Sequence, residues 1–156
     1  MAVFLDSPGR SPFAVREWAD WLAEMMLIVK SPVGFTVNLI LVDDACIARL
    51  NSCVMDCPGP TNVISFPAEG AEKSLAKGGG LALAEEVGHP EFGNCNIAEI
   101  YLSLDTLKRE CRLYGQALED HAKRLLAHGL GHVLGYDHGL EMDALTDFLV
   151  EGLADG

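Results

Sequence analysis

The sequence of 156 residues lacks any long, uninterrupted run of apolar side chains. A membrane-spanning helix needs roughly 18 consecutive, mostly apolar residues, and the apolar segment from Trp21 to Val29 is interrupted by Glu24. The first ten residues, MAVFLDSPGR, lack the basic region and apolar core that a secretory signal requires. We therefore expect a cytoplasmic protein with no membrane partner.

Cysteines are few, odd in number and irregularly spaced. The five cysteines are Cys46, Cys53, Cys57, Cys95 and Cys111, and they form no disulfide framework. Cys53 and Cys57 could share a metal, but no second pair at zinc-site spacing accompanies them. Because we also expect a reducing compartment, we interpret Cys53 and Cys57 as two free thiols.

Basic residues are scarce: 11 Lys and Arg stand against 23 Asp and Glu, so the net charge is -12. Such a balance disfavours non-specific binding to a phosphate backbone, and we expect no DNA partner. The charge is unevenly spread, because Ser103 to Gly135 holds five basic and four acidic residues, whereas Tyr136 to Gly156 holds six acidic and no basic ones. A local basic face is compatible with this distribution but is not demonstrated by it.

The length suits one domain, residues 1–156, and the spacing of apolar residues predicts four strands and five helices. The expected strands are the N-terminal VFLD, Thr36–Val42, Val63–Phe66 and Ile97–Leu102. The expected helices are Phe13–Val29, a short one from Asp43 or Asp44 to about Asn51, one from Asp105 to Gly115, Leu118–Leu134, and Met142–Leu153. Ala68 to Gly93 is expected to be a long hairpin connection. Strands come early and helices late, so we predict an α+β fold: a two-layer arrangement with a small mixed sheet.

The segment HGLGHVLGYDH, from His128 to His138, is the most informative part of the sequence. His128 and His132 are four residues apart on a predicted helix, so both side chains project from one face. Gly135 favours a helix end and a tight turn, which can bring His138 to the same point. Three imidazoles leave a fourth tetrahedral position open, as in catalytic zinc sites, although nickel, cobalt or iron would also accept them. We predict one zinc ion per chain, which lowers the pKa of its bound water to about 7.

The residue after His128 argues against a peptidase. In the zinc peptidase pattern H-E-x-x-H that residue is the general base, but here it is Gly129. We therefore rank a metallopeptidase or amidase last. A phosphodiester can be cleaved by the metal and its water with less need of a carboxylate base, and glycine leaves room for a large anionic group. We assign no side-chain base.

Two motifs resemble those of the YbeY family of endoribonucleases and ribosomal RNA maturation factors. The first, HGLGHVLGYDH, is similar to the family pattern H-G-x-L-H-L-x-G-Y-D-H and matches its three metal-binding histidines. The second, PTNVISFP from Pro60 to Pro67, is similar to P-T-(D/N)-V-L-S-F-P. AEIYLS, from Ala98 to Ser103, matches the family's G-D-I-x-I-S only loosely. The resemblance extends over most of the chain from about Thr36.

The resemblance implies a cytoplasmic, metal-dependent endoribonuclease specific for single-stranded RNA. It also implies a role in ribosomal RNA maturation and ribosome quality control, with the ribosome or its small subunit as partner. One departure leaves an alternative open. Met55 stands where family members carry an arginine that would hold phosphate oxygens, and we consider Arg49 and Arg112 as substitutes for it. The alternative is a metal-binding ribosome-assembly factor with weak or no cleavage activity.

Three further residues are candidates for supporting or substrate-facing roles. Asp137 is placed to orient an imidazole by accepting its second N–H, or else it bonds the backbone of its own turn. His121 lies too far along the helix to share the metal, so it either contacts RNA or packs in the interior. Ser65 either faces the cleft from the end of its strand or is a plain strand serine.

Overall fold

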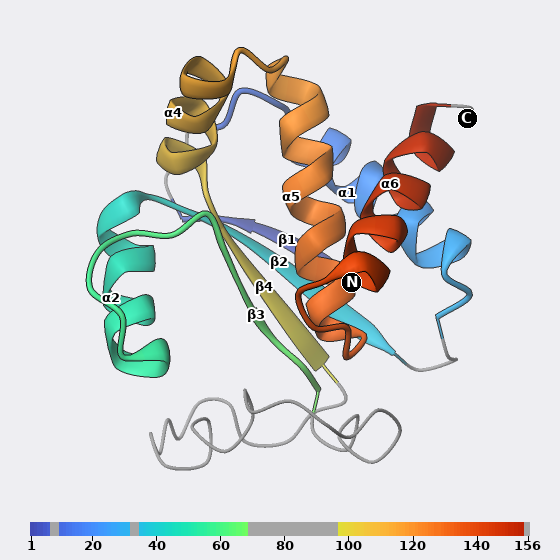
Figure 1. The fold of residues 1–156 in the computed structure, drawn as a ribbon, viewed down its shortest axis with the longest axis horizontal. Helices are drawn as coiled ribbons and strands as arrows, with labels where there is room; N and C mark the ends of the chain where they lie inside the picture. Colours follow the sequence, from blue (N-terminus) through green and yellow to red (C-terminus); the bar gives the residue numbers. More distant parts are fainter. Residues whose placement is uncertain (7–9, 32–34, 69–96, 155–156) are drawn as a thin grey trace.

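The sheet at the centre of the molecule has the order β1-β2-β4-β3. The computed structural model describes residues 1–6, 10–31, 35–68 and 97–154, so most of the predicted hairpin connection lies outside the described residues. β1 (Ala2–Leu5), β2 (Thr36–Val42) and β4 (Ile97–Ser103) are parallel, and β3 (Val63–Phe66) runs antiparallel to β4. β3 therefore forms one edge of a mixed sheet (Figure 1).

One face of the sheet carries most of the core. Alternate residues of β2 and β4 point to this face, and Leu39, Leu41 and Ile100 are fully buried there. The helices α1 (Val15–Ile28), α5 (Leu118–Val133) and α6 (Leu140–Ala154) lie on this side (Figure 1). The cluster contains apolar side chains from all of these elements, so α5 is held between the sheet and α6.

The other face is covered by α2 (Asp44–Met55) over a smaller apolar cluster. Val42 and Ile64 from the sheet and Ile47 from α2 form its buried part. Asp43 caps the helix by accepting a hydrogen bond from the backbone N–H of Cys46 at 2.8 Å. Of the two caps that the sequence allows, the structure therefore uses Asp43.

α4 (Leu104–Tyr114) follows β4 directly and is joined to α2 through Asp44. The Asp44 carboxylate accepts hydrogen bonds from the hydroxyls of Ser103 and Thr106 at 2.7 and 2.6 Å and from Arg109 at 2.8 Å. Burial alone would raise the Asp44 pKa, but the hydrogen bonds from Arg109, Thr106 and Ser103 and the charge of Arg109 outweigh it and lower the pKa. This network joins the starts of two helices.

The predicted α+β class, four-stranded mixed sheet and five helices are confirmed within the described part of the chain. The predicted two layers describe the main core. α2 adds a cover on the second face, because Ile40 and Val42 of β2 present apolar side chains there. No helix within the described ranges is both long and apolar enough to cross a bilayer.

Candidate metal centre

α5 brings His128 and His132 over the sheet because its backbone lies directly on β3 and β4. A Cβ atom at Gly129 would come within 2.8 Å of Ile100 Cγ2 and 3.0 Å of Val63 Cγ2, so only glycine allows this approach. The Ser65 hydroxyl donates a hydrogen bond to the Gly129 carbonyl at 2.8 Å. The helix is thus anchored to the sheet at the residue that follows His128.

The end of α5 is a Schellman motif, which reverses the chain toward His138. The Gly135 N–H donates to the His132 carbonyl at 3.0 Å, and the Tyr136 N–H donates to the Gly131 carbonyl at 3.0 Å. Gly135 has φ of 95°, a left-handed conformation that glycine adopts without a steric penalty. The bend that the sequence predicts at Gly135 is therefore present.

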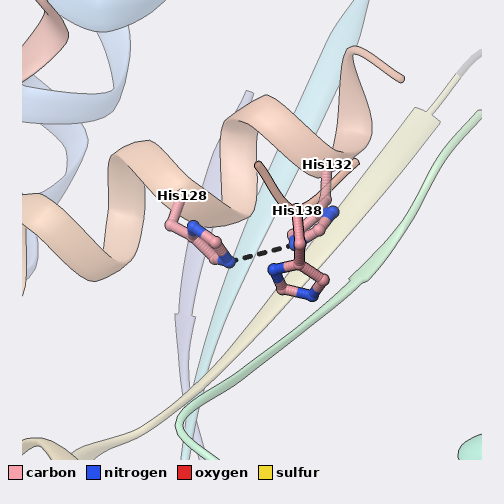
Figure 2. Close-up of side chains that lie close together, drawn as sticks. All are labelled: His128, His132 and His138. Atoms are coloured by element: carbon pink, nitrogen blue, oxygen red, sulfur yellow. Dashed lines mark hydrogen bonds between the residues drawn. The ribbon is translucent and has the colours of Figure 1, made fainter. Parts of the chain in front are cut away.

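The imidazoles of His128, His132 and His138 converge on one point (Figure 2). The Nε2 atoms of His128 and His132 are 3.0 Å apart, and one ligand atom from each of the three rings lies within 4.8 Å of the others. The ring centroids are separated by 4.6 to 5.3 Å. Figure 2 shows two rings coming from α5 and the third from the turn that follows it.

The electrostatics of the cluster favour neutral rings. Burial lowers the pKa of His128, and the nearby His138 acts in the same direction. Burial, reinforced by His128 and His138, lowers the pKa of His132 to about 4. Neutral imidazole is the form that binds a metal, so at neutral pH the rings of His128 and His132 present lone pairs.

The donor set fits a divalent metal ion. Nitrogen ligands at 2.0–2.1 Å around a tetrahedral zinc ion are about 3.3 Å apart, close to the 3.0 Å between the two Nε2 atoms. His138 is exposed, whereas His128 and His132 are partly buried, so solvent reaches the cluster from the turn side. Within the described ranges, these three residues form the one group of histidine, cysteine or carboxylate ligands compatible with a metal ion.

His121 lies largely in the interior of the protein. Its side chain is 9% exposed, and its Nε2 atom lies 2.7 Å from Glu110 Oε2. Asn62 donates to the other oxygen of Glu110 at 3.2 Å. The Nδ1 atom of His121 is buried and has no hydrogen-bond partner within the described part of the chain. Of the two interpretations of His121, the structure favours packing.

Asp137 is exposed, and its carboxylate forms no hydrogen bond with any of the three rings in the described structure. The neighbouring Tyr136 instead provides a backbone hydrogen bond to His132, which acts against the lowering of the His132 pKa. Metal-bound histidines commonly donate their second N–H to such a group. The structure therefore places a backbone group of Tyr136, and not the Asp137 carboxylate, in hydrogen-bond contact with His132.

The positions that depart from the family patterns lie on two elements. Met55 ends α2, and its side chain is 50% exposed. Glu99 alternates with Ile100 on β4 and so faces away from α5, where it accepts a hydrogen bond from the Tyr101 hydroxyl at 2.9 Å. The acid at position 99 therefore does not point toward the histidine cluster.

A hollow of about 220 Å³ adjoins the cluster at His128, and the sequence did not reveal it. It is lined by Asn62, His121, Arg124, Leu125, His128, Asp143 and Thr146; we call it the His128 hollow. Arg124 was detectable in the sequence, because it precedes His128 by four residues on the same helix. Asn62 and Asp143 carry no such local signal, since they come from distant parts of the chain.

Comparisons with known proteins agree on one family. Residues 10–148 match the family model described as endoribonuclease YbeY. A protein of that name from Nitratidesulfovibrio vulgaris is 41% identical over 149 residues, which cover 93% of this chain and 90% of the relative. Another from Ruegeria pomeroyi is 39% identical, covering 91% and 80%. The solution structure of TM1509 from Thermotoga maritima shares the fold, with a TM-score of 0.60 at 22% identity over 99% of this chain and 89% of that one.

Proposed function

The chain belongs to the endoribonuclease YbeY family, and from this premise we propose that it is a metal-dependent endoribonuclease acting on single-stranded RNA. The single observation that carries the proposal is the convergence of three imidazoles from α5 and its following turn. The family accounts for the RNA substrate, and the cluster accounts for the chemistry. The proposed enzyme comprises residues 1–156 as one hydrolase domain.

We assign the metal ligands to His128, His132 and His138, with one zinc ion per chain. Zinc held in this way supplies Lewis acidity for activating water and polarising a phosphoryl oxygen. The protein's part is to keep the three rings oriented and close together, which the Tyr136 backbone and the Gly135 bend support, while burial favours the neutral forms of His128 and His132. No side-chain base is assigned.

The biological setting follows from the family resemblance. We propose that the RNA is ribosomal, that the protein works on the ribosome or its small subunit, and that it takes part in maturation and quality control in the cytoplasm. The net charge of -12 supports recognition of a defined RNA region rather than general adhesion to nucleic acid.

The proposal is tested by elemental analysis of the purified protein together with cleavage of a single-stranded RNA, with and without a chelator. We expect one zinc per chain and cleavage that the chelator abolishes. His132→Ala should lose both metal and cleavage, whereas His121→Gln, a histidine on the same helix outside the cluster, should retain the metal. A His132→Ala protein that cuts RNA at the full rate would contradict the proposal, as would turnover of peptides with none of RNA.

One observation favours a second candidate, an assembly factor that binds metal and cleaves weakly. Met55 is half exposed and uncharged where the resemblance places a phosphate-binding arginine. If this loss limits catalysis, Met55→Arg should raise the rate of RNA cleavage markedly, while metal content stays constant. An unchanged rate in an active enzyme would mean that another cation already serves the site.

A further inference from the structure

Arg124 is the one Lys or Arg side chain among the residues that line the His128 hollow. It precedes His128 by one helical turn on α5, so both side chains project from the same side of the helix. Arg124 thus lines the same hollow as His128, one of the three histidines of the cluster. Its planar N–H groups match two oxygens of one phosphate, which makes arginine the usual residue for that task.

The present partner of Arg124 holds it weakly. Its Nη1 atom lies 2.8 Å from Asp147 Oδ1 on α6, and the two side chains are 47% and 56% exposed. Exposed ion pairs of this kind contribute little to stability because water screens both charges. The guanidinium can therefore exchange Asp147 for a more strongly charged anion at small cost.

Two other basic side chains on α4 and α5, Arg109 and Lys123, already form ion pairs with neighbouring carboxylates. Arg109 binds Asp44 at 2.8 Å, and Lys123 binds Glu119 at 2.7 Å while lying over the ring of Trp21. The two arginines that the sequence suggested as substitutes, Arg49 and Arg112, are not among the residues that line the hollow. The structure thus points to a different residue from those the sequence suggested.

We propose that Arg124 binds a phosphate of the RNA strand beside the three-histidine cluster, in the role that the resemblance gives to an arginine at position 55. The inference rests on the proposed RNA cleavage. Asp143 lines the same hollow and opposes an anion there, but a divalent ion held by the histidines would make the local charge positive. Arg124 is then the side chain that orients the phosphate against the cluster.

The test compares Arg124→Gln with Asp147→Asn in the metal-loaded protein. Binding is measured with a labelled single-stranded RNA whose 2′-O-methyl phosphorothioate backbone resists cleavage. Loss of one charge-assisted contact should weaken Arg124→Gln binding roughly tenfold. It should also reduce the slope of log K against log salt by about 0.7. Asp147→Asn, which only frees the guanidinium, should bind equally or more tightly. Metal content and thermal midpoint should be unchanged in Arg124→Gln.

Two controls make the outcome decisive. Arg16→Gln removes an arginine from α1 whose side chain is 90% exposed and should leave RNA affinity unchanged, whereas Arg124→Lys should restore part of the affinity. If Arg124→Gln and Asp147→Asn weaken binding equally and lower the thermal midpoint together, Arg124 is only a structural ion-pair partner and the inference is wrong. Wild-type affinity and salt slope in Arg124→Gln would overturn the inference while the proposed function stands. A wild-type protein that neither binds nor cuts RNA would overturn both.

Discussion

At the scale of single residues, the Ser65 hydroxyl joins two elements that are distant in the chain. It donates to the carbonyl of Gly129, 64 residues further on, at 2.8 Å. That carbonyl belongs to the residue after His128, so the bond helps to set where the His128 side chain lies. The Ser65 hydroxyl thus helps to hold α5 against β3.

We expect Ser65→Ala to lower the free energy of unfolding by about 1 kcal/mol, the usual contribution of one hydrogen bond. Urea denaturation of the metal-free protein measures this change. Ser52→Ala on the exposed side of α2 is the matched control and should change stability far less. An equal loss of unfolding free energy in the two variants would show that the hydrogen bond from Ser65 does not stabilise the fold.

The lowered pKa of His132 also has a consequence at this scale. In the folded protein the ring titrates at about 4, whereas in the unfolded chain it should titrate near 6.5. As pH falls from 6.5 toward 4, the unfolded state takes up a proton that the folded state does not. The metal-free protein should therefore lose stability over this interval.

Urea denaturation at pH 7.5 and pH 5 checks this prediction. The wild type should lose more stability between the two values than His132→Ala, which lacks the titrating ring. Identical losses would contradict it. A histidine with the ordinary pKa of about 6.5 would release its metal as pH falls below that value, but the lowered pKa values of His128 and His132 move the expected release to lower pH.

At the scale of elements, the position of α5 depends on two glycines with different surroundings. A Cβ atom at Gly129 would meet Ile100 Cγ2 at 2.8 Å, a stiff branched side chain on β4. A Cβ atom at Gly131 would meet Met142 Sδ at 2.5 Å, in a flexible side chain of α6 that can move aside. An added side-chain atom is therefore tolerated less well on the side of α5 that faces the sheet than on the side that faces α6.

Gly129→Ala should destabilise the protein by about 1–3 kcal/mol, as overpacking of a tight contact does. It should also reduce metal affinity, because α5 must move away from the sheet. Gly131→Ala should cost less, since alanine gains helix propensity of up to about 1 kcal/mol over glycine. Chemical denaturation and metal titration of both variants measure the difference. A larger loss in Gly131→Ala would show that α6, rather than the sheet, positions the helix.

At the scale of the whole molecule, the histidine cluster links α5 to the turn that leads into α6. An ion held by His128, His132 and His138 would oppose separation of these parts on unfolding. Since such an ion binds the folded state and not the unfolded one, its binding energy adds to stability.

Removal of the metal should lower the thermal midpoint. Free metal at 100 times its dissociation constant adds about 2.7 kcal/mol, which corresponds to roughly 5–10 °C for a chain of this size. Calorimetry with and without a chelator measures the shift. His138→Ala is a suitable control, because that side chain is exposed and its loss should largely abolish the metal-dependent shift. A chelator that lowers the thermal midpoints of the wild type and His138→Ala equally would contradict the prediction.

Features that depend on neighbours along the chain were predictable from the sequence. The bounds of β2 and β3 agree with those predicted, Thr36–Val42 and Val63–Phe66, because short β-branched runs between turn residues are strong local signals. The four-residue spacing of His128 and His132 and the bend at Gly135 are equally local. Metal binding by these residues remains a prediction.

Contacts between residues that are distant in the chain were not predictable from local patterns. The strand order β1-β2-β4-β3, the cover of α2 on the second face and the bond from Ser65 to Gly129 all depend on how the sheet and helices pack. The same packing buries His121. It also forms the hollow that Arg124 and His128 line together with Asn62, just before β3, and Asp143 and Thr146 of α6. Local spacing sets the direction in which a side chain leaves its helix, but the neighbours it meets there are set by contacts across the whole fold.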